Sequence, residues 1–226
     1  LMRLLNSMDG SLRGQKQVEI IIADGGSTDG QTLKYYDILR RNGAAKVFCG
    51  KGMPMPALLN AAAKEADREN CLFMDSNVEA LGINWLHDML SQSERRGCGG
   101  VGPKLIGQDG RLVYTGITIG IGGWQGSPYA GTPDDRESGQ KLRFTGTLRT
   151  VSALSWVCMM TPMDLFFNAG CFDESFNETG FDTEYCTRLD RRGYSLIYAP
   201  NVVMKYHGRI QKVADADGQD RMRYYD

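Results

Sequence analysis

The sequence predicts an α/β fold in which helices flank a mixed, mainly parallel sheet. Apolar, strand-like runs alternate with helical patterns along the first half of the chain, which is typical of parallel sheets. The run at residues 18–23 is almost continuously apolar and rich in β-branched residues, as expected for a strand buried on both faces. Polar turns follow two of the runs, at residues 24–30 and 75–77. Ligands of such sheets bind beyond the carboxyl ends of the strands, so we expect a site at these turns.

The elements of this alternation are predicted in order from the spacing of apolar residues. Leucine and methionine recur at helical spacing in residues 1–8, and turn residues within 6–10 predict the end of that helix. After the strand at 18–23, the patterns predict a helix at 32–41, a strand at 45–49, a helix at 56–67, a strand at 71–74 and a helix at 85–96.

The pattern changes in the middle of the chain. Residues 101–105 and 112–121, joined through Asp109 and Gly110, predict a hairpin. Residues 122–140 are rich in Gly, Pro, Ser and Asp and predict a long loop, a feature that is usually functional or mobile. A strand at 151–160 and a short helix at 163–169 follow. We therefore expect one domain over residues 1–208 and a polar tail over 209–226.

Composition excludes several classes of function. The chain has 226 residues, 42% of them hydrophobic, with 26 basic and 27 acidic side chains and a net charge of −1. This balance does not favour a nucleic-acid partner or a polybasic membrane patch. No apolar run approaches the roughly 20 residues that span a bilayer. The six cysteines are scattered singly without metal-ligand spacing, so we expect buried free thiols in a reducing cytosol.

The segment from Phe172 to His207 is the most informative. It combines Phe-Asp-Glu at 172–174, Asp182-Thr183-Glu184, Arg188-Leu189, Gly193-Tyr194 and a final Tyr206-His207. An acidic pair opens a predicted helix, the helix ends at a glycine, a β-rich run follows, and a lone histidine closes the segment. This order can hold a carboxylate base and a metal-binding imidazole over one pocket. Together with the acidic turns at 24–29 and 75–77, it favours sugar transfer from an activated nucleotide.

Four blocks in this order resemble the family 2 glycosyltransferases with the GT-A fold, and most closely the bacterial members that build rhamnose-containing and other surface polysaccharides. The blocks are residues 20–29, 72–79, 101–122 and 151–207. Members of that family begin with a strand that touches the nucleotide, and this sequence begins after it. The resemblance therefore implies a GT-A domain, Rossmann-like in its sheet, whose first nucleotide-binding strand is missing from the chain.

For the donor, the resemblance implies that Asp24, with Gly26 and Ser27, binds the nucleotide. Asp24 ends a buried strand, and the glycines after it let a backbone approach a ligand closely. The alternative is a turn and helix cap, an interpretation that suits Asp29 well.

For the metal, the resemblance implies Mg²⁺ or Mn²⁺ bound by Asp75, Asn77 and His207, with Asp75 also near the donor. A hard divalent cation accepts one or two carboxylates plus phosphate oxygens and water. The alternatives are an Asx turn that closes the strand before Asp75 and a solvated loop histidine.

Asp182 takes the position of the family's general base, a group that removes the proton of the acceptor hydroxyl. The alternative is a helix cap, since Thr179 and Asp182 have the spacing of a capping box.

Three residues are expected at the acceptor. Trp124 and Trp156 could stack on the apolar faces of sugar rings, although core packing explains Trp156 equally well. Glu184 is either a second carboxylate of the site or the partner of Arg188.

The implied function is inverting transfer from a UDP- or dTDP-linked sugar to a carbohydrate hydroxyl, in surface polysaccharide or glycoconjugate synthesis. We expect it in the cytoplasm or peripheral to the inner face of the membrane, with possible neighbouring domains or a membrane-associated assembly. Asn77 and Phe181 depart from the family's motifs and favour an alternative, an inactive relative that binds carbohydrate or acts as a scaffold. A nucleotidyltransferase is a weaker possibility, because no glycine-rich loop bearing Arg or Lys for a triphosphate is visible.

Overall fold

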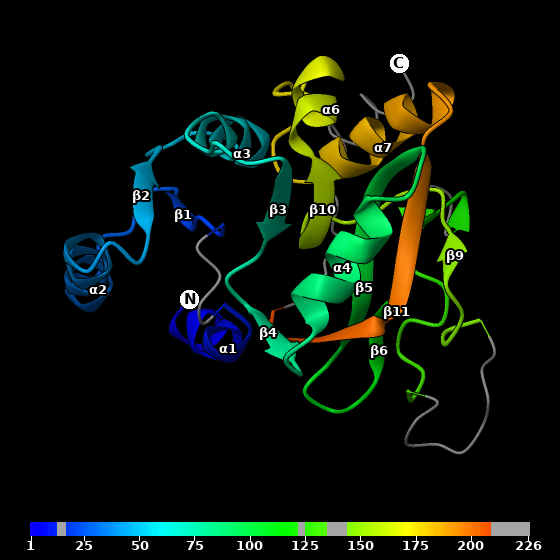
Figure 1. Ribbon diagram of the computed structural model, residues 1–226, viewed down its shortest axis with the longest axis horizontal. Helices are drawn as coiled ribbons and strands as arrows, with labels where there is room; N and C mark the ends of the chain where they lie inside the picture. The colour runs from blue at the N-terminus through cyan, green and yellow to red at the C-terminus, as the bar shows by residue number, and fades with distance from the viewer. Residues whose placement is uncertain (13–16, 122–124, 135–143, 209–226) are drawn as a thin grey trace.

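The computed structural model describes residues 1–12, 17–121, 125–134 and 144–208 (Figure 1). The helices are α1 (Met2–Leu12), α2 (Gly30–Arg41), α3 (Met55–Lys64), α4 (Trp85–Ser93), α6 (Met163–Asn168) and α7 (Phe181–Arg191). The strands are β1 (Ile21–Asp24), β2 (Lys46–Cys49), β3 (Asn70–Met74), β4 (Val78–Leu81), β5 (Cys98–Ile106), β6 (Leu112–Tyr114), β7 (Thr118–Ile119), β8 (Gln125–Gly126), β9 (Arg149–Thr150), β10 (Cys158–Pro162) and β11 (Ser195–Tyr206).

A seven-stranded mixed sheet forms the centre of the molecule. Its order is β3-β10-β5-β11-β4, with β6 beside β5 and β9 beside β11. The predicted α/β class and mixed sheet are confirmed, but the expectation of mainly parallel pairing is wrong. Within this sheet only β5 and β11 are described as a parallel pair, and the other pairs are antiparallel. The β5–β6 hairpin has a short connection, which can join only antiparallel neighbours. The other antiparallel pairs join strands that are far apart in the chain, so the alternation of strands and helices along the sequence did not reveal their direction.

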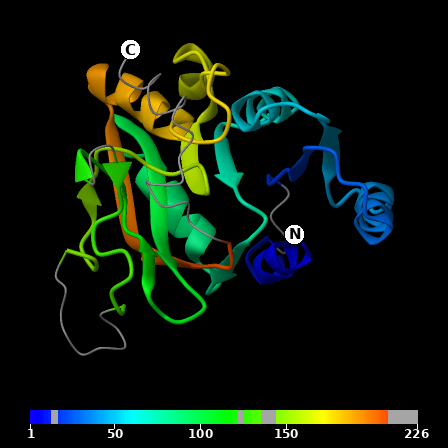
Figure 2. The same cartoon turned by 180° about the vertical axis from the view of Figure 1, so that it is seen from behind.

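A second, two-stranded sheet lies beside the first. Strands β1 and β2 pair in parallel. Helix α3 lies between β2 and β3 in Figure 1, and α2 lies beyond β2, on the side away from β3 (Figures 1 and 2). Among the described residues, β1 pairs only with β2 and β3 pairs only with β10, so each has one unpaired edge. A first strand ahead of residue 1, as the resemblance implies, stays a prediction.

Helix α4 covers one face of the central sheet, and α6 and α7 lie at one end of it (Figures 1 and 2). An aromatic cluster joins α6, α7 and β3, with neighbouring ring centroids 4.8 to 5.4 Å apart. Its members are Phe73, Phe166, Phe172, Phe181 and Tyr185, all of them buried. Edge-to-face contacts of this kind add to the free energy of burial, so the first turn of α7 is anchored in the core.

Several elements differ from prediction. Helix α1 continues through Gly10 to Leu12, because Ser7 turns its hydroxyl back to the Leu4 carbonyl at 2.7 Å and so fits within the helix. Strand β4 was not predicted at all. The predicted strand at 151–160 is instead β10 at Cys158–Pro162. Residues 151–157 before it form an irregular stretch, called the crossing segment below, whose buried Ala153 and Leu154 resemble the apolar residues of a strand. The predicted hairpin is present, although β6 ends at Tyr114.

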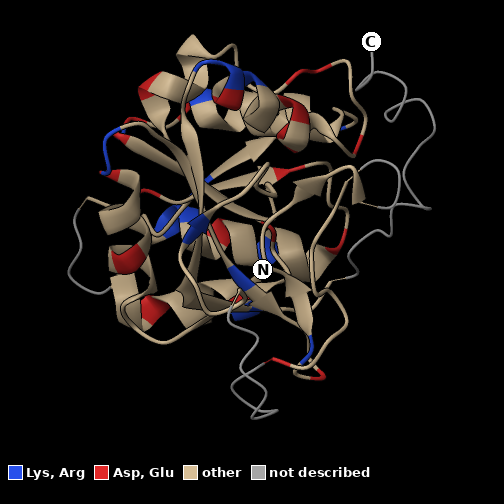
Figure 3. Ribbon diagram, turned by 90° about the vertical axis from the view of Figure 1, so that its right-hand side faces the viewer, with Lys and Arg blue, Asp and Glu red and all other residues tan. Residues whose placement is uncertain are grey.

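Acidic and basic residues are interspersed along the ribbon in Figure 3, and each sign occurs on several elements. In the described ranges, no helix combines the length and the apolar character that a bilayer crossing requires. All six cysteines are free thiols; three are buried, but Cys49 is exposed, contrary to expectation.

Candidate functional site

The carboxylate of Asp182 is buried at the start of α7. The helix begins at Phe181 after Gly180, whose φ of +87° favours glycine, and no side chain caps it. The predicted capping box with Thr179 is therefore wrong. Asp182 is 5% exposed, and its Oδ2 accepts a hydrogen bond from the Trp156 amide at 3.0 Å while Oδ1 accepts from the Thr183 amide at 2.8 Å. Burial raises the pKa of Asp182 and outweighs these hydrogen bonds, which lower it.

Asp75 is hydrogen-bonded to the residue that follows Trp156 in the crossing segment. The Asp75 amide donates to the Val157 carbonyl at 2.9 Å, and Val157 follows Trp156, the partner of Asp182. Two hydrogen bonds and two residues of chain limit the separation of Asp182 Oδ2 and the Asp75 amide to about 13 Å. The Oδ1 atom of Asp75 accepts from the Asn77 amide at 2.7 Å and from Asn77 Nδ2 at 2.9 Å. These two hydrogen bonds are those of an Asx turn, the alternative interpretation of Asp75. They use Oδ1 and leave Oδ2 free to bind a ligand.

His207 lies beside this turn. Its amide donates to the Asn77 carbonyl at 2.9 Å, which places the three predicted metal ligands next to one another. The Nε2 atom of His207 is 2.6 Å from Glu79 Oε2 in β4. Sequence analysis did not single out Glu79 as a functional residue. Its signal in the sequence is weak, because Glu79 follows the turn at residues 75–77 and its pairing with His207 joins positions 128 residues apart.

The donor atoms at this turn suit a magnesium or manganese ion that also binds phosphate. No group of three or more His, Cys, Asp or Glu side chains within the described ranges is placed to hold a metal by itself. Mg²⁺, however, is commonly bound by one or two carboxylates plus substrate phosphates and water. Asp75 Oδ2 and Asn77 Oδ1 are oxygen ligands of that kind. Glu79 on one ring nitrogen of His207 leaves Nδ1 for a metal, the arrangement in which a carboxylate orients a ligating imidazole.

Asp24 ends β1 and organises the turn after it. Its carboxylate accepts hydrogen bonds from the Ser27 amide at 3.0 and 3.2 Å, the Ser27 hydroxyl at 2.5 Å and the Tyr36 hydroxyl at 3.2 Å. Burial raises its pKa, but these hydrogen bonds prevail and the pKa is lowered overall. Gly26 has a φ of +115°, and a Cβ there would stand 3.0 Å from the Lys51 side chain.

The predicted donor residues therefore form one compact turn, and Asp29 caps α2 as the alternative interpretation has it. No described contact joins this turn to Asp75, so the structure brings the predicted residues together as two groups rather than one. The first group is Asp75, Asn77, His207 and Asp182, and the second is Asp24, Gly26 and Ser27.

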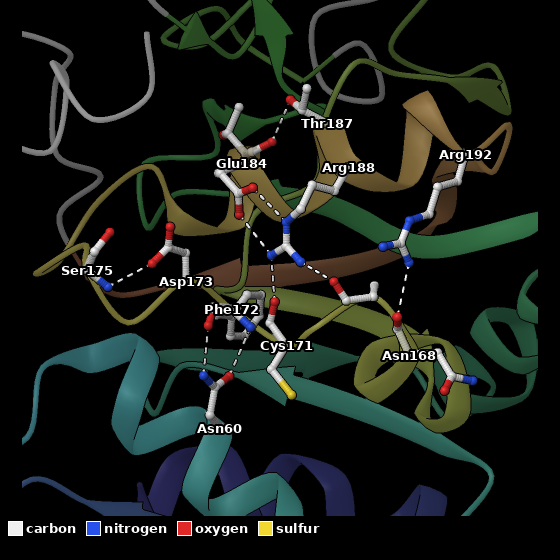
Figure 4. Close-up of polar contacts among 12 residues, drawn as sticks. Asn60, Asn168, Cys171, Phe172, Asp173, Ser175, Glu184, Thr187, Arg188 and Arg192 are labelled. Carbon is white, nitrogen blue, oxygen red and sulfur yellow. Dashed lines mark hydrogen bonds and ion pairs between the residues drawn. The ribbon is translucent and has the colours of Figure 1, made fainter. Parts of the chain in front are cut away.

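Arg188 holds the loop before α7 in place. Its guanidinium donates to the Ala169 carbonyl, to the Cys171 carbonyl at 2.6 Å, and to both carboxylate oxygens of Glu184 at 2.6 and 2.8 Å (Figure 4). Of the two alternatives for Glu184, the geometry is that of an Arg188 partner. From the other side, the Asn60 amide pairs with the backbone of Phe172 at 2.8 and 3.0 Å (Figure 4).

Of the two tryptophans predicted at the acceptor, the structure describes only Trp156. Trp156 is half-buried, with its ring 6.1 Å from that of Phe181, and its amide is the donor to Asp182. Its stacking on a sugar stays a prediction. Trp124 lies outside the described residues.

Two curated bacterial proteins are similar to the chain in sequence. No family model matches the chain. The chain is 27% identical over 216 residues to the O-antigen biosynthesis protein RfbC of Myxococcus xanthus, and 26% identical over 212 residues to the uncharacterized protein y4gI of Sinorhizobium fredii. These matches cover 94% and 91% of the chain but only 17% and 23% of the relatives, so the chain spans about a fifth of their length.

Solved structures extend the likeness to the whole fold. The chain superposes on GalNAc-T7, solved with UDP, GalNAc and Mn²⁺, with a TM-score of 0.74 over 99% of the chain and 44% of that protein, at 17% identity. For the Pyrobaculum calidifontis mannosyltransferase PcManGT, solved with GDP-Man and Mn²⁺, the TM-score is 0.64 at 14% identity over 92% of the chain and 52% of that protein. Staphylococcus aureus TarS gives 0.60 at 18% identity over 91% of the chain and 56% of that protein. The fold is that of the GT-A glycosyltransferases, as the resemblance implied.

The Arg188 contacts predict a specific loss of stability. Arg188→Ala should lower the free energy of unfolding by about 2–3 kcal/mol, because it leaves two backbone carbonyls and the Glu184 carboxylate without their donor. Arg188→Lys should recover little, since an ammonium cannot reproduce the planar fork. Urea denaturation measures both.

Arg192→Ala is the matched control, because Arg192 is exposed and, among the described residues, its side chain donates to the Asn168 carbonyl alone, at 3.1 Å (Figure 4). Its loss should cost about 0.5 kcal/mol or less. Equal effects of the two alanine variants would contradict the assigned role of Arg188.

Proposed function

We propose that this domain is an inverting glycosyltransferase that moves a sugar from a nucleotide diphosphate to a carbohydrate hydroxyl. The GT-A fold supports the reaction class, and the similarity to an O-antigen biosynthesis protein supports surface polysaccharide or glycoconjugate synthesis as its setting. That setting implies the cytoplasm or the inner face of the membrane.

One observation carries the proposal. The buried carboxylate of Asp182 and the exposed turn of Asp75 are bonded to adjacent residues, Trp156 and Val157. A base and a diphosphate-binding carboxylate must flank one sugar carbon in this reaction, since the attacking hydroxyl and the departing phosphate stand on opposite sides of it. The crossing segment between them fixes that spacing.

Asp182 acts as the general base. Its carboxylate takes the proton of the acceptor hydroxyl as that oxygen attacks the anomeric carbon, and the bond from that carbon to the diphosphate oxygen breaks. A single displacement of this kind inverts the sugar. The amides of Trp156 and Thr183 occupy one position on each carboxylate oxygen, which orients the group and leaves further lone pairs for the proton. A raised pKa makes Asp182 a stronger base once it is ionised.

The donor is held at the two turns. Asp75 and Asn77 supply oxygen ligands and His207 an imidazole for Mg²⁺ or Mn²⁺, with Glu79 orienting the ring. Such an ion, when bound, stabilises negative charge on a departing diphosphate. Asp24 and the turn at Gly26 and Ser27 bind the base or ribose of a UDP- or dTDP-linked donor.

The inactive alternative loses part of its support. It rested on Asn77 and Phe181, but Phe181 is fully buried and packs 5.0 Å from the ring of Phe172, so its side chain serves the core. Asn77 remains a neutral ligand, which weakens a metal site without removing it.

Replacement of the base tests the mechanism. Asp182→Asn should lower kcat for sugar transfer by about 10²–10⁴-fold, because the amide cannot take a proton. Binding of UDP with Mn²⁺, measured by calorimetry, should persist. Asp164→Asn, in the exposed first turn of α6, is the control and should leave transfer unchanged. Full activity in Asp182→Asn would exclude this residue as the base.

The pH dependence of sugar transfer should reflect the raised pKa of the buried Asp182. Asp182 must be ionised to act, and its pKa is raised from the ordinary 3.8, so kcat/KM should fall with decreasing pH at values above those of an ordinary carboxylate. UDP binding should tolerate the same pH range, because the pKa of Asp24 is lowered. A profile that stays flat down to about pH 4 would contradict the assignment.

The metal ligands predict a gain of affinity. Asn77→Asp adds a second carboxylate beside Asp75 and should tighten Mn²⁺ binding by roughly tenfold in the presence of UDP, because ligand charge sets affinity for hard cations. Electron paramagnetic resonance of free Mn²⁺ measures this change. Asn84→Asp, an exposed position preceding α4, is the control. Unchanged affinity in Asn77→Asp would place the metal elsewhere.

A further inference from the structure

An open cavity of about 560 Å³ lies apart from both turns. That volume is within the range of small-molecule sites. Its lining combines aromatic rings, hydroxyl groups and one carboxylate, and the residues used below are Tyr129, Phe144, Arg149, Ser152, Thr187 and Asp190.

The apolar groups of this cavity face solvent. Phe144 is 64% exposed, Ile119 38% and Tyr129 37%, three of the large apolar side chains that the fold leaves uncovered. Clustered exposure of this kind marks a binding surface more often than chance. Tyr129 is held in a left-handed conformation with a φ of +64°, and the Thr132 hydroxyl fixes it by donating to its carbonyl at 2.7 Å. The ring is therefore presented by a rigid turn.

The charge of the cavity does not favour a phosphate-bearing occupant. Its only cation in the described lining is Arg149, which donates to the Phe144 and Thr115 carbonyls at 2.6 Å each and lies 4.4 Å over the Tyr198 ring. Asp190 is exposed, and its carboxylate adds one negative charge to the same lining. With one cation and one carboxylate, the described lining has no excess of positive charge to attract a diphosphate. A neutral ligand with apolar faces and hydroxyl groups fits, and a pyranose has both.

Two segments connect the cavity directly to Asp182. Thr183, Thr187 and Asp190 recur at helical spacing on one stripe of α7, and the Thr187 hydroxyl donates to the Thr183 carbonyl at 2.8 Å (Figure 4). Thr187 stands about 7.5 Å and Asp190 about 12 Å beyond Asp182 along the helix axis. From the other side, Ser152 lies four residues before Trp156, whose amide binds Asp182.

We propose that this cavity is the subsite for the part of the acceptor saccharide beyond the sugar that carries the reacting hydroxyl. The inference rests on the proposed function and adds the place and chemistry of acceptor recognition. Aromatic rings at Tyr129 and Phe144 stack on sugar faces, and the hydroxyls of Ser152 and Thr187 with the Asp190 carboxylate bond to sugar hydroxyls. The acceptor is therefore an oligosaccharide without charge in that part.

Glycan binding tests this assignment. The protein, loaded with UDP and Mn²⁺, is applied to an array of neutral oligosaccharides of two to four residues, and affinities for the bound glycans are measured by saturation-transfer NMR. Phe144→Ala should weaken binding by about tenfold, because it removes one stacking ring. Phe167→Ala removes a ring that is 36% exposed on α6, outside the cavity, and should change nothing. Calorimetry with UDP follows each variant.

The outcomes separate the two proposals. Equal glycan affinity in wild type and Phe144→Ala overturns the subsite and leaves the transferase function intact. The same conclusion follows if the wild-type protein binds UDP but none of the oligosaccharides. A change in sedimentation in Phe144→Ala with unchanged glycan affinity overturns it in favour of a protein interface. Loss of UDP binding in the wild type instead contradicts the proposed function itself.

Discussion

The hydrogen bond from the Trp156 amide to the buried Asp182 carboxylate is the contact on which the candidate site depends. A carboxylate removed from water is tolerated only with donors in fixed positions, and main-chain amides cannot rotate away. Because Val157 follows Trp156 and accepts the amide of Asp75, fixing the first carboxylate also fixes the second. Burial and fixed donors thus give Asp182 a raised pKa and one orientation, two properties required of a base.

This geometry needs a rigid frame around the first turn of α7. Phe181 and Tyr185 anchor the helix in the aromatic core, while Arg188 ties it to the preceding loop. Asn60 of α3 holds Phe172 of the same loop through both backbone groups. Side chains that bond to backbone make the loop part of the core, so Asp182, the proposed base, is positioned before any ligand binds.

The sequence predicts α7, its acidic first turn and the fold class, because spacing and residue type carry those signals. It does not predict what Trp156 does at Asp182. Sequence analysis assigned Trp156 a role through its ring, whereas its described contact with the site is an amide that every residue except proline has. The crossing segment before β10 was taken for a strand for a related reason: Ala153 and Leu154 are fully buried, and apolar composition does not distinguish an extended crossing from a strand.

The two departures from the family's motifs share one electrostatic consequence. A carboxylate at Phe181 would stand next to Asp182 inside the core, and like charges in a buried site raise each other's pKa. A carboxylate at Asn77 would face Asp75, whereas the amide donates to it. A carboxylate at either position would therefore put a negative charge beside a carboxylate that the proposed reaction requires in its ionised form. Under the proposed mechanism, Asn77 and Phe181 thus favour the ionised forms of Asp75 and Asp182, which an active enzyme would need and an inactive scaffold would not.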